Sequence, residues 1–191
     1  MFKNVNIPKT IRFKRSMSMM KRALVFVLLL VAALSTVSAY DTTPFQFGIW
    51  PSKYQIVPEE INVSGLKINL PFGGNNYIQG VDLGLASTSL DTSALQINIL
   101  VNRAHENFSG LQFAILNQAG RSNGIILGGI NITDESVRGI EVGLINSSLE
   151  CRGLQVGLIN YTEMMTGLQI GLINIITESV VPFFPIINFC F

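Results

Sequence analysis

Five glutamates recur along the second half of the chain at a spacing that would align them on one edge of a repeating fold. They are Glu106, Glu135, Glu150, Glu163 and Glu178. Such a stripe of carboxylates could bind Ca²⁺, which takes six to eight oxygen ligands from clustered acids. These glutamates are instead spread over separate segments, among three arginines: Arg121, Arg138 and Arg152. The pattern therefore favours a solvated, charge-balanced face over a metal site.

The remaining candidates for chemistry are one histidine, two cysteines and one glycine-rich stretch. His105 lies in a polar segment, where we expect a solvated loop residue. Cys151 and Cys190 lack metal-site spacing, and although they could pair in an oxidising compartment, we expect free thiols. The stretch "NLPFGGNN" (69–76) lacks the lysine and following helix of a phosphate-binding loop and indicates an elongated turn. The sequence therefore predicts a non-enzymatic protein without catalytic, cofactor-binding or metal-binding residues.

An eight-residue phrase of the type "GLQIGLIN" recurs through most of the chain. Its first residues are Gly65, Gly80, Ala94, Gly110, Gly124, Gly139, Gly153 and Gly167, which are 15, 14, 16, 14, 15, 14 and 14 residues apart. The second, fourth and sixth positions are apolar except at Gly129, the third is mostly polar, and the fifth is small or polar. This period-two alternation is typical of a half-buried β-strand. The polar segments between phrases carry a lone apolar residue that we expect to point inward: Phe108, Val137, Cys151 and Met165.

Two all-β folds could use this repeat. In a β-solenoid, here a parallel β-roll of eight coils with about 14 residues per coil, every repeat meets the same surroundings, as the uniform phrase suggests. In a small antiparallel outer-membrane β-barrel, the natural repeat is two strands. The barrel alternative would put Leu and Ile outward and Gln and Gly inward, and it suits the closing "FFPIINFCF" with its aromatic-x-aromatic end. The short strands and the lack of aromatic girdles in the repeats favour the solenoid.

The eighth position of the phrase adds a second argument for the solenoid. Asparagines recur there, and the earliest joins them if Val101 is an insertion: Asn102, Asn117, Asn131, Asn146, Asn160 and Asn174. Identical side chains one strand spacing apart can hydrogen-bond along a parallel stack, which satisfies buried amides. Antiparallel strands would scatter these asparagines to opposite rims. We therefore predict that the six residues form a structural asparagine ladder.

The amino-terminal region predicts export. Lys21 and Arg22 precede an apolar run at 23–34, and the small residues at 37–39 follow it. We interpret residues 1–39 as a secretory signal peptide cleaved after Ala39, with an over-extended start if translation begins at Met19 or Met20. Seven of the 13 basic residues and none of the 12 acids lie in this leader, so the mature chain carries 6 minus 12, or −6. That charge argues against nucleic acid as a partner.

The mature chain is predicted to be one repeat domain with capped ends. We expect an amino-terminal cap segment at 40–64, the eight-repeat β domain at 65–179 and an aromatic, proline-containing cap at 180–191. In the last of these, Pro182 and Pro185 would prevent further strand addition.

Three stretches of the chain resemble a known class of proteins. The tandem "GLQIGLIN" phrases, the opening "VSGLKINLPFGGNNYIQGVDLGLAS" and the closing "VVPFFPIINFCF" are similar to exported surface-repeat proteins of bacteria, over roughly residues 46–191. The resemblance implies a place at the cell surface, outer membrane or periplasm and a structural or adhesive role, without an activity. The expected partner is an envelope component or surface ligand of unidentified chemistry. A membrane would be a partner only in the barrel alternative.

Overall fold

The computed structural model describes residues 42–50 and 54–191. These residues form β1 (Thr42–Trp50), β2 (Tyr54–Gln55), β3 (Asn62–Val142), β4 (Ile145–Val156), β5 (Ile159–Ile176) and β6 (Phe183–Cys190). The all-β prediction is confirmed for this part of the chain, which contains no helix long and apolar enough to cross a membrane. The predicted signal peptide and its cleavage site after Ala39 lie outside the described residues.

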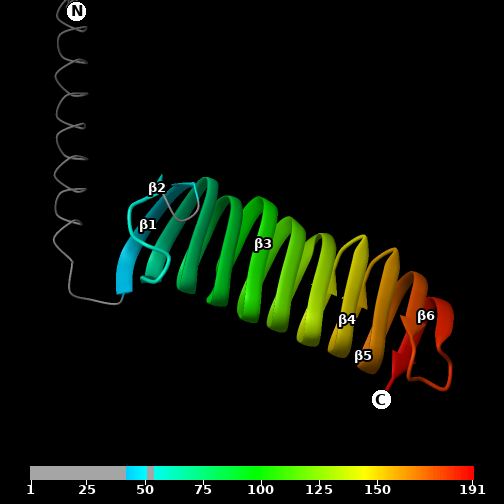
Figure 1. The fold of residues 1–191 in the computed structure, drawn as a ribbon. Helices are drawn as coiled ribbons and strands as arrows, with labels where there is room; N and C mark the ends of the chain where they lie inside the picture. The colour runs from blue at the N-terminus through cyan, green and yellow to red at the C-terminus, as the bar shows by residue number, and fades with distance from the viewer. Residues whose placement is uncertain (1–41, 51–53) are drawn as a thin grey trace, which may run out of the picture. The chain divides into compact units, whose positions relative to one another are not determined.

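The strands belong to one open sheet in the order β2-β1-β3-β4-β5-β6. β1 pairs parallel with β3, β3 with β4, and β4 with β5, whereas β2 and β6 pair antiparallel with their neighbours. Figure 1 shows the successive turns of β3, β4 and β5 lying side by side along one axis, with β6 at the end of the row. This arrangement is compatible with a β-solenoid. The antiparallel neighbours that the barrel alternative predicts occur only at the two ends of the described sheet.

Equivalent positions of successive phrases lie opposite one another. Gly139 is paired with Gly153, and Gly153 with Gly167, and the offset between β4 and β5 stays at 14 residues throughout their register. Between β3 and β4 the register shifts between Thr133 and Ser136, where the chain has one extra residue. A bulge can absorb one extra residue without disturbing the pairing on either side. The variable segment lengths are therefore compatible with a constant phrase register.

Glycine opens the phrase because the backbone there has a positive φ and lies against the preceding turn. The φ angles are 141° at Gly139, 149° at Gly153 and 149° at Gly167. A Cβ on Gly153 would overlap the carbonyl oxygen of Gly139, and a Cβ on Gly167 would overlap that of Gly153. Residues with a side chain rarely adopt such angles, and here they would also lack room. Seven of the eight phrases therefore open with a glycine corner, and the third phrase, which opens with Ala94, does not have the positive φ.

The interior enclosed by the turns has an apolar part and a polar part. The lone apolar residues of the segments between phrases are buried, as the sequence predicts, and they pack in two clusters. The first contains Ala104, Phe108, Ala119 and Ile126, and the second contains Val137, Cys151, Met165 and Ile176. The polar part consists of third-position and eighth-position side chains such as Gln155 and Asn160, both fully buried.

The apolar side chains at the second, fourth and sixth positions point outward. In a strand that packs on an apolar core, such side chains would point inward. The side chains of Ile99, Leu144 and Leu172 are 60%, 58% and 66% exposed. The sequence analysis placed Leu and Ile outward in the barrel alternative. In the structure, the Leu and Ile side chains of a parallel sheet face outward. The physical reason at the second and fourth positions is the buried third-position side chain between them, because alternate residues of a strand point to opposite faces. The sixth position lies at a bend, since the strands are interrupted at residues 143–144 and 157–158.

Both predicted cap segments contribute strands: β1 and β2 lie in the first and β6 in the second. In the segment 40–64, β1 pairs in parallel with the first phrase, and its Gln46 lies opposite Lys67 at the third position. The stretch "PFQFGIW" (44–50) therefore continues the repeat, which the sequence analysis did not recognise. In the segment 180–191, β6 reverses direction and pairs antiparallel with β5, with Asn188 opposite Gln169 and a register shift where Pro185 lies.

Removal of residues 153–166 should shorten the sheet by one turn and leave a folded protein. The constant 14-residue offset would place Asn146 opposite Asn174 and Glu141 opposite Gln169 after the deletion. In a stacked repeat, stability is roughly a sum over neighbouring turns, so the loss is limited to one turn and one interface. Far-ultraviolet circular dichroism and thermal unfolding of the purified variant should show a β spectrum and a cooperative transition. A variant that is unfolded or aggregated would contradict this architecture.

Candidate functional site

The six predicted asparagines form one continuous hydrogen-bonded row inside the sheet, and all six are fully buried. The Nδ2 of each donates to the Oδ1 of the next: Asn102 to Asn117 at 3.0 Å, Asn117 to Asn131 at 2.9 Å, and Asn131 to Asn146, Asn146 to Asn160 and Asn160 to Asn174 at 2.8 Å. At the end of the row, Asn174 donates to the carbonyl oxygens of Gly171 and Phe184. The row therefore links the repeat to β6.

The glycine at the fifth position of the phrase makes room for this row. The Nδ2 of Asn146 also donates to the carbonyl oxygen of Val156 at 3.0 Å, so each amide bridges side chain and backbone of the next turn. A Cβ on Gly157 would lie 2.8 Å from Asn146 Nδ2 and 3.1 Å from Asn160 Oδ1. A larger residue in place of Gly157 would therefore displace these two asparagines.

A second buried row runs along the third position, with its hydrogen bonds directed the opposite way. Gln169 Nε2 donates to Gln155 Oε1 at 2.9 Å, and Gln155 Nε2 donates to Glu141 Oε2 at 2.8 Å. The same order is found earlier, from Gln112 to Gln96 at 2.8 Å and from Gln96 to Asp82 at 2.9 Å. In sequence order, the first residue of each run therefore carries a carboxylate, which accepts hydrogen bonds and needs no acceptor of its own. The recurring glutamine at the third position was the sequence signal for this row, and the sequence analysis missed it.

Two buried ionisable groups in this row have shifted pKa values. Burial raises the pKa of Glu141 to about 7, although hydrogen bonds from Gln155 and Thr133 oppose the shift. Burial lowers the pKa of Lys67 to about 8, opposed by the charges of Asp82 and Glu59. Lys67 Nζ donates to Ser87 Oγ at 3.1 Å. Because both Lys67 and Ser87 are buried, a substrate in solvent does not reach this pair.

The glutamates, arginines and cysteines with which the sequence analysis began lie on the surface or in the apolar core. His105 is exposed as expected but lies in β3 rather than in a loop. The stretch 69–76 is also part of β3, so the predicted elongated turn is wrong there. Arg121 Nε pairs with Glu135 and Arg152 Nε pairs with Glu150, both at 2.6 Å, as expected for a charge-balanced face. Among the described residues, no group of three His, Cys, Asp or Glu side chains is placed to hold a metal ion. Cys151 and Cys190 are free thiols, and burial raises the pKa of Cys151 to about 12, which makes its thiol unreactive.

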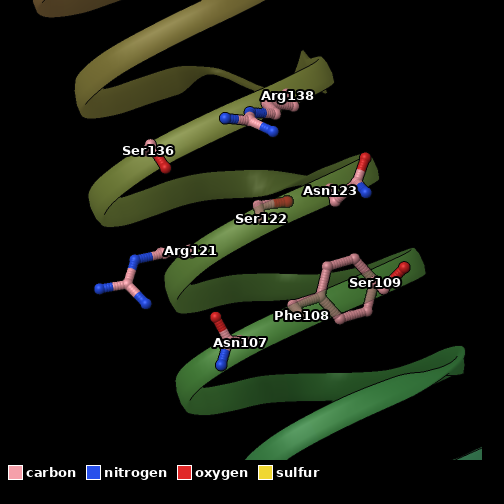
Figure 2. A pocket seen from close by; sticks show the side chains of 8 residues that line it. All are labelled: Asn107, Phe108, Ser109, Arg121, Ser122, Asn123, Ser136 and Arg138. Carbon is pink, nitrogen blue, oxygen red and sulfur yellow. The ribbon is translucent and has the colours of Figure 1, made fainter.

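A shallow hollow on β3 collects polar side chains from three successive turns (Figure 2). Its lining residues are Asn107, Phe108, Ser109, Arg121, Ser122, Asn123, Ser136 and Arg138. Arg121 is already paired with Glu135, and Figure 2 shows its side chain directed away from the ribbon. Asn107 Nδ2 donates to Asp91 Oδ1 at 2.8 Å. Arg121 and Asn107 are thus engaged within the protein, and we assign no ligand to this hollow.

A recurring surface feature is the set of outward apolar side chains at the second, fourth and sixth positions of the phrases, which we name the outer apolar face. Exposure is greatest at the sixth position, where Leu70, Ile99, Ile115, Leu144, Leu158 and Leu172 are 50–66% exposed. A monomer rarely exposes a contiguous apolar patch larger than a few hundred Å². The geometry therefore points to the outer apolar face as the candidate binding surface.

Comparison with known proteins adds no assignment, because no family model, curated protein or solved structure matches this chain. The resemblance to exported surface-repeat proteins therefore stays a prediction.

Replacement of Asn146 by Leu should destabilise the fold by about 1–3 kcal/mol, because it leaves Asn131 Nδ2 without its side-chain acceptor and Asn160 Oδ1 without its donor. Urea unfolding of the wild type and the variant measures the difference. Asn107→Leu is the matched control, because its amide is exposed and bonds only Asp91, and it should change the free energy of unfolding little. Equal effects of the two substitutions would show that the buried row does not stabilise the fold.

Replacement of Glu141 by Gln should alter how stability depends on pH. The folded pKa of about 7 exceeds the ordinary value of 4.5, so the folded state binds more protons between these pH values, and wild-type stability falls as pH rises through this window. The loss amounts to about 3 kcal/mol above pH 7. The amide oxygen of the introduced glutamine would still accept from Gln155, so the variant should gain this amount relative to wild type between pH 4.5 and 7.5. Parallel pH profiles in urea unfolding would contradict the assignment.

Proposed function

We propose that this chain is a non-enzymatic, exported repeat protein of the bacterial cell envelope or surface that acts by association. In this proposal the fold is a β-solenoid with eight phrase-bearing coils. The parallel pairing of neighbouring phrases and the constant register of Gly139, Gly153 and Gly167 support a solenoid over an antiparallel barrel.

The arrangement of the polar groups supports a structural role. The amides of Asn146, Asn160, Gln155 and Gln169 are buried and bonded to equivalent groups one turn away. Their hydrogen-bonding capacity is used to hold the turns in register, so they stabilise a long, uniform scaffold. The export itself rests on the predicted signal peptide and on the resemblance to surface-repeat proteins.

One observation carries the proposal: a scaffold with a polar interior presents its apolar side chains to the outside. Rows of exposed Leu and Ile that repeat at the strand spacing cost solvation free energy unless another surface covers them. Ile115 and Leu144, at 59% and 58% exposure, are typical of these rows. The outer apolar face is thus the surface through which the protein associates.

Replacement of Ile99, Leu144 and Leu172 by Lys should abolish association and leave the fold intact, because these side chains lie on the outer apolar face. The full chain is expressed in a bacterium, cells are fractionated, and chemical cross-linking of intact cells reports the assembly. The wild type should leave the cytoplasm and appear in a cross-linked complex, which the variant loses.

The control for this experiment replaces Leu90, Leu149 and Met164 by Lys. These side chains are 42%, 40% and 42% exposed but lie in the segments between phrases, so this variant should keep the complex. A chain retained in the cytoplasm, or equal loss of the complex in both triple variants, would refute the proposed function.

A further inference from the structure

We propose that the side chains of Lys67 and Asn69 condense spontaneously into an amide cross-link, with Asp82 transferring the proton. The first two residues occupy the third and fifth positions of the first phrase, Asp82 occupies the third position of the second phrase, and all three are fully buried. A reaction within the chain needs no substrate from solvent, so burial does not prevent it. This cross-link is independent of the proposed function, which concerns the outside of the turns.

The side chains of Lys67 and Asn69 lie close together inside the first turn. Residues two apart in a strand face the same way with their Cα atoms about 7 Å apart, and the four-carbon stem of lysine is flexible. Lys67 Cε and Asn69 Cγ lie 3.2 Å and 2.7 Å from the point that a Cβ on Gly73 would occupy, so they are at most 5.9 Å apart, the sum of these distances. The reaction requires rotation near the end of the lysine stem, because Nζ now donates to Ser87 Oγ, 3.1 Å away.

Lys67 is suited to act as the nucleophile. Burial lowers the pKa of its amine from 10.5 to about 8, although the charges of Asp82 and Glu59 oppose the shift. A larger fraction of Lys67 is therefore uncharged near neutral pH than for a lysine in solvent, and the uncharged amine has the free electron pair that attacks a carbonyl carbon. Lys67 also forms no ion pair with a carboxylate of the described residues.

Asn69 and Asp82 are placed as electrophile and proton carrier. Asn69 Nδ2 donates to Asp82 Oδ1 at 2.6 Å, and Asn69 Oδ1 is buried without a partner. Attack on Asn69 Cγ therefore breaks no hydrogen bond of its carbonyl oxygen. Asp82 is the poorer electrophile, because its Oδ1 and Oδ2 accept from Asn69 and Gln96 as an ionised carboxylate does, and such a group has no good leaving group.

The reaction uses only these three side chains. The electron pair of Lys67 Nζ forms a bond to Asn69 Cγ, and a proton of Nζ passes to the Asp82 carboxylate. Asp82 gives this proton to Asn69 Nδ2, the Cγ–Nδ2 bond breaks, and ammonia leaves with the electron pair of that bond. The product is a secondary amide, and its N–H takes the place of Nδ2 as a donor to Asp82. The cross-link also removes a buried ammonium group, which is costly in an interior.

Peptide mass spectrometry tests the cross-link. The purified, folded full chain is incubated at pH 8, near the lowered pKa of Lys67, and is then denatured and digested with trypsin. The wild type should resist cleavage after Lys67, and the segment 67–69 should be lighter by one molecule of ammonia than its sequence requires. A segment of full mass that trypsin cuts, or a loss of water, which would link Lys67 to a carboxylate, would overturn the proposal.

Three variants, each shown to be folded by circular dichroism, assign the roles. Lys67→Arg removes the nucleophile and Asp82→Asn removes the proton carrier, so both should abolish the loss of ammonia. Ser87→Ala is the matched control, because it removes the partner of Nζ and keeps the three reacting groups, so it should cross-link at least as completely as the wild type. A cross-link that survives in either of the first two variants, or disappears in the third, would contradict these roles.

The third phrase supplies an internal control. Asn98 occupies the same fifth position, is fully buried and also has an unpaired Oδ1, but Gln96 takes the third position in place of a lysine. Fragmentation of the wild-type peptide should therefore find Asn98 at its full mass. Loss of ammonia at Asn98 as well would show that burial of an asparagine, rather than a neighbouring amine, causes the change, and would overturn the cross-link.

Discussion

Buried amides must find hydrogen-bond partners within the protein, and here the partners are the same amides one turn away. Leaving a buried amide unpaired costs more free energy than its hydrogen bond contributes. The asparagine and glutamine rows are therefore compatible with only one spacing and one register of the turns. The two rows donate in opposite directions, and each run of glutamines starts from Asp82 or Glu141, which only accept when ionised. The last glutamine of each run has an unpaired acceptor: Gln112 Oε1 and Gln169 Oε1 are buried without a partner. The third-position residue of the phrase after Gln112 is Ile126. The residue opposite Gln169 is Asn188 of the antiparallel β6.

The amide rows explain why the phrase repeats closely while the segments between phrases vary. Where the phrase carries both glycines, as in the last four phrases, the first forms a corner against the preceding turn and the fifth leaves space for an asparagine, so both are constrained by close contacts. Between phrases, an inward residue such as Cys151 or Met165 need only fill an apolar space. Apolar packing is non-directional and accepts different side chains of similar volume, whereas hydrogen bonds along a stack do not. Extra residues in the segments are accommodated in bulges, as between Thr133 and Ser136.

A polar interior also determines the surface. Because alternate residues of a strand point to opposite faces, every amide turned inward places its Leu or Ile neighbours outside. The same choice that holds the turns in register therefore produces the outer apolar face. Structural stability and association come from one pattern. The larger buried apolar side chains lie in the clusters around Phe108 and Cys151 and at Val63 and Ile78. This coupling is why we connect the scaffold with a role in the envelope or at the cell surface.

The sequence by itself determined the all-β class, the repeat period and the residues of the asparagine row, because each follows from spacing along the chain. It did not determine the strand bounds, which run through the segments between phrases and break within the phrase at residues 143–144 and 157–158. It also identified the inward residues between phrases, such as Val137, since a lone apolar residue in a polar segment has one favourable place. Period-two alternation, however, reads the same whichever side faces inward, so only the tertiary structure decided that the amides lie inside and Leu and Ile outside. The tertiary structure also decided that β1 continues the repeat and that β6 reverses, because "PFQFGIW" lacks the opening glycine and β6 takes its direction from the turn before it.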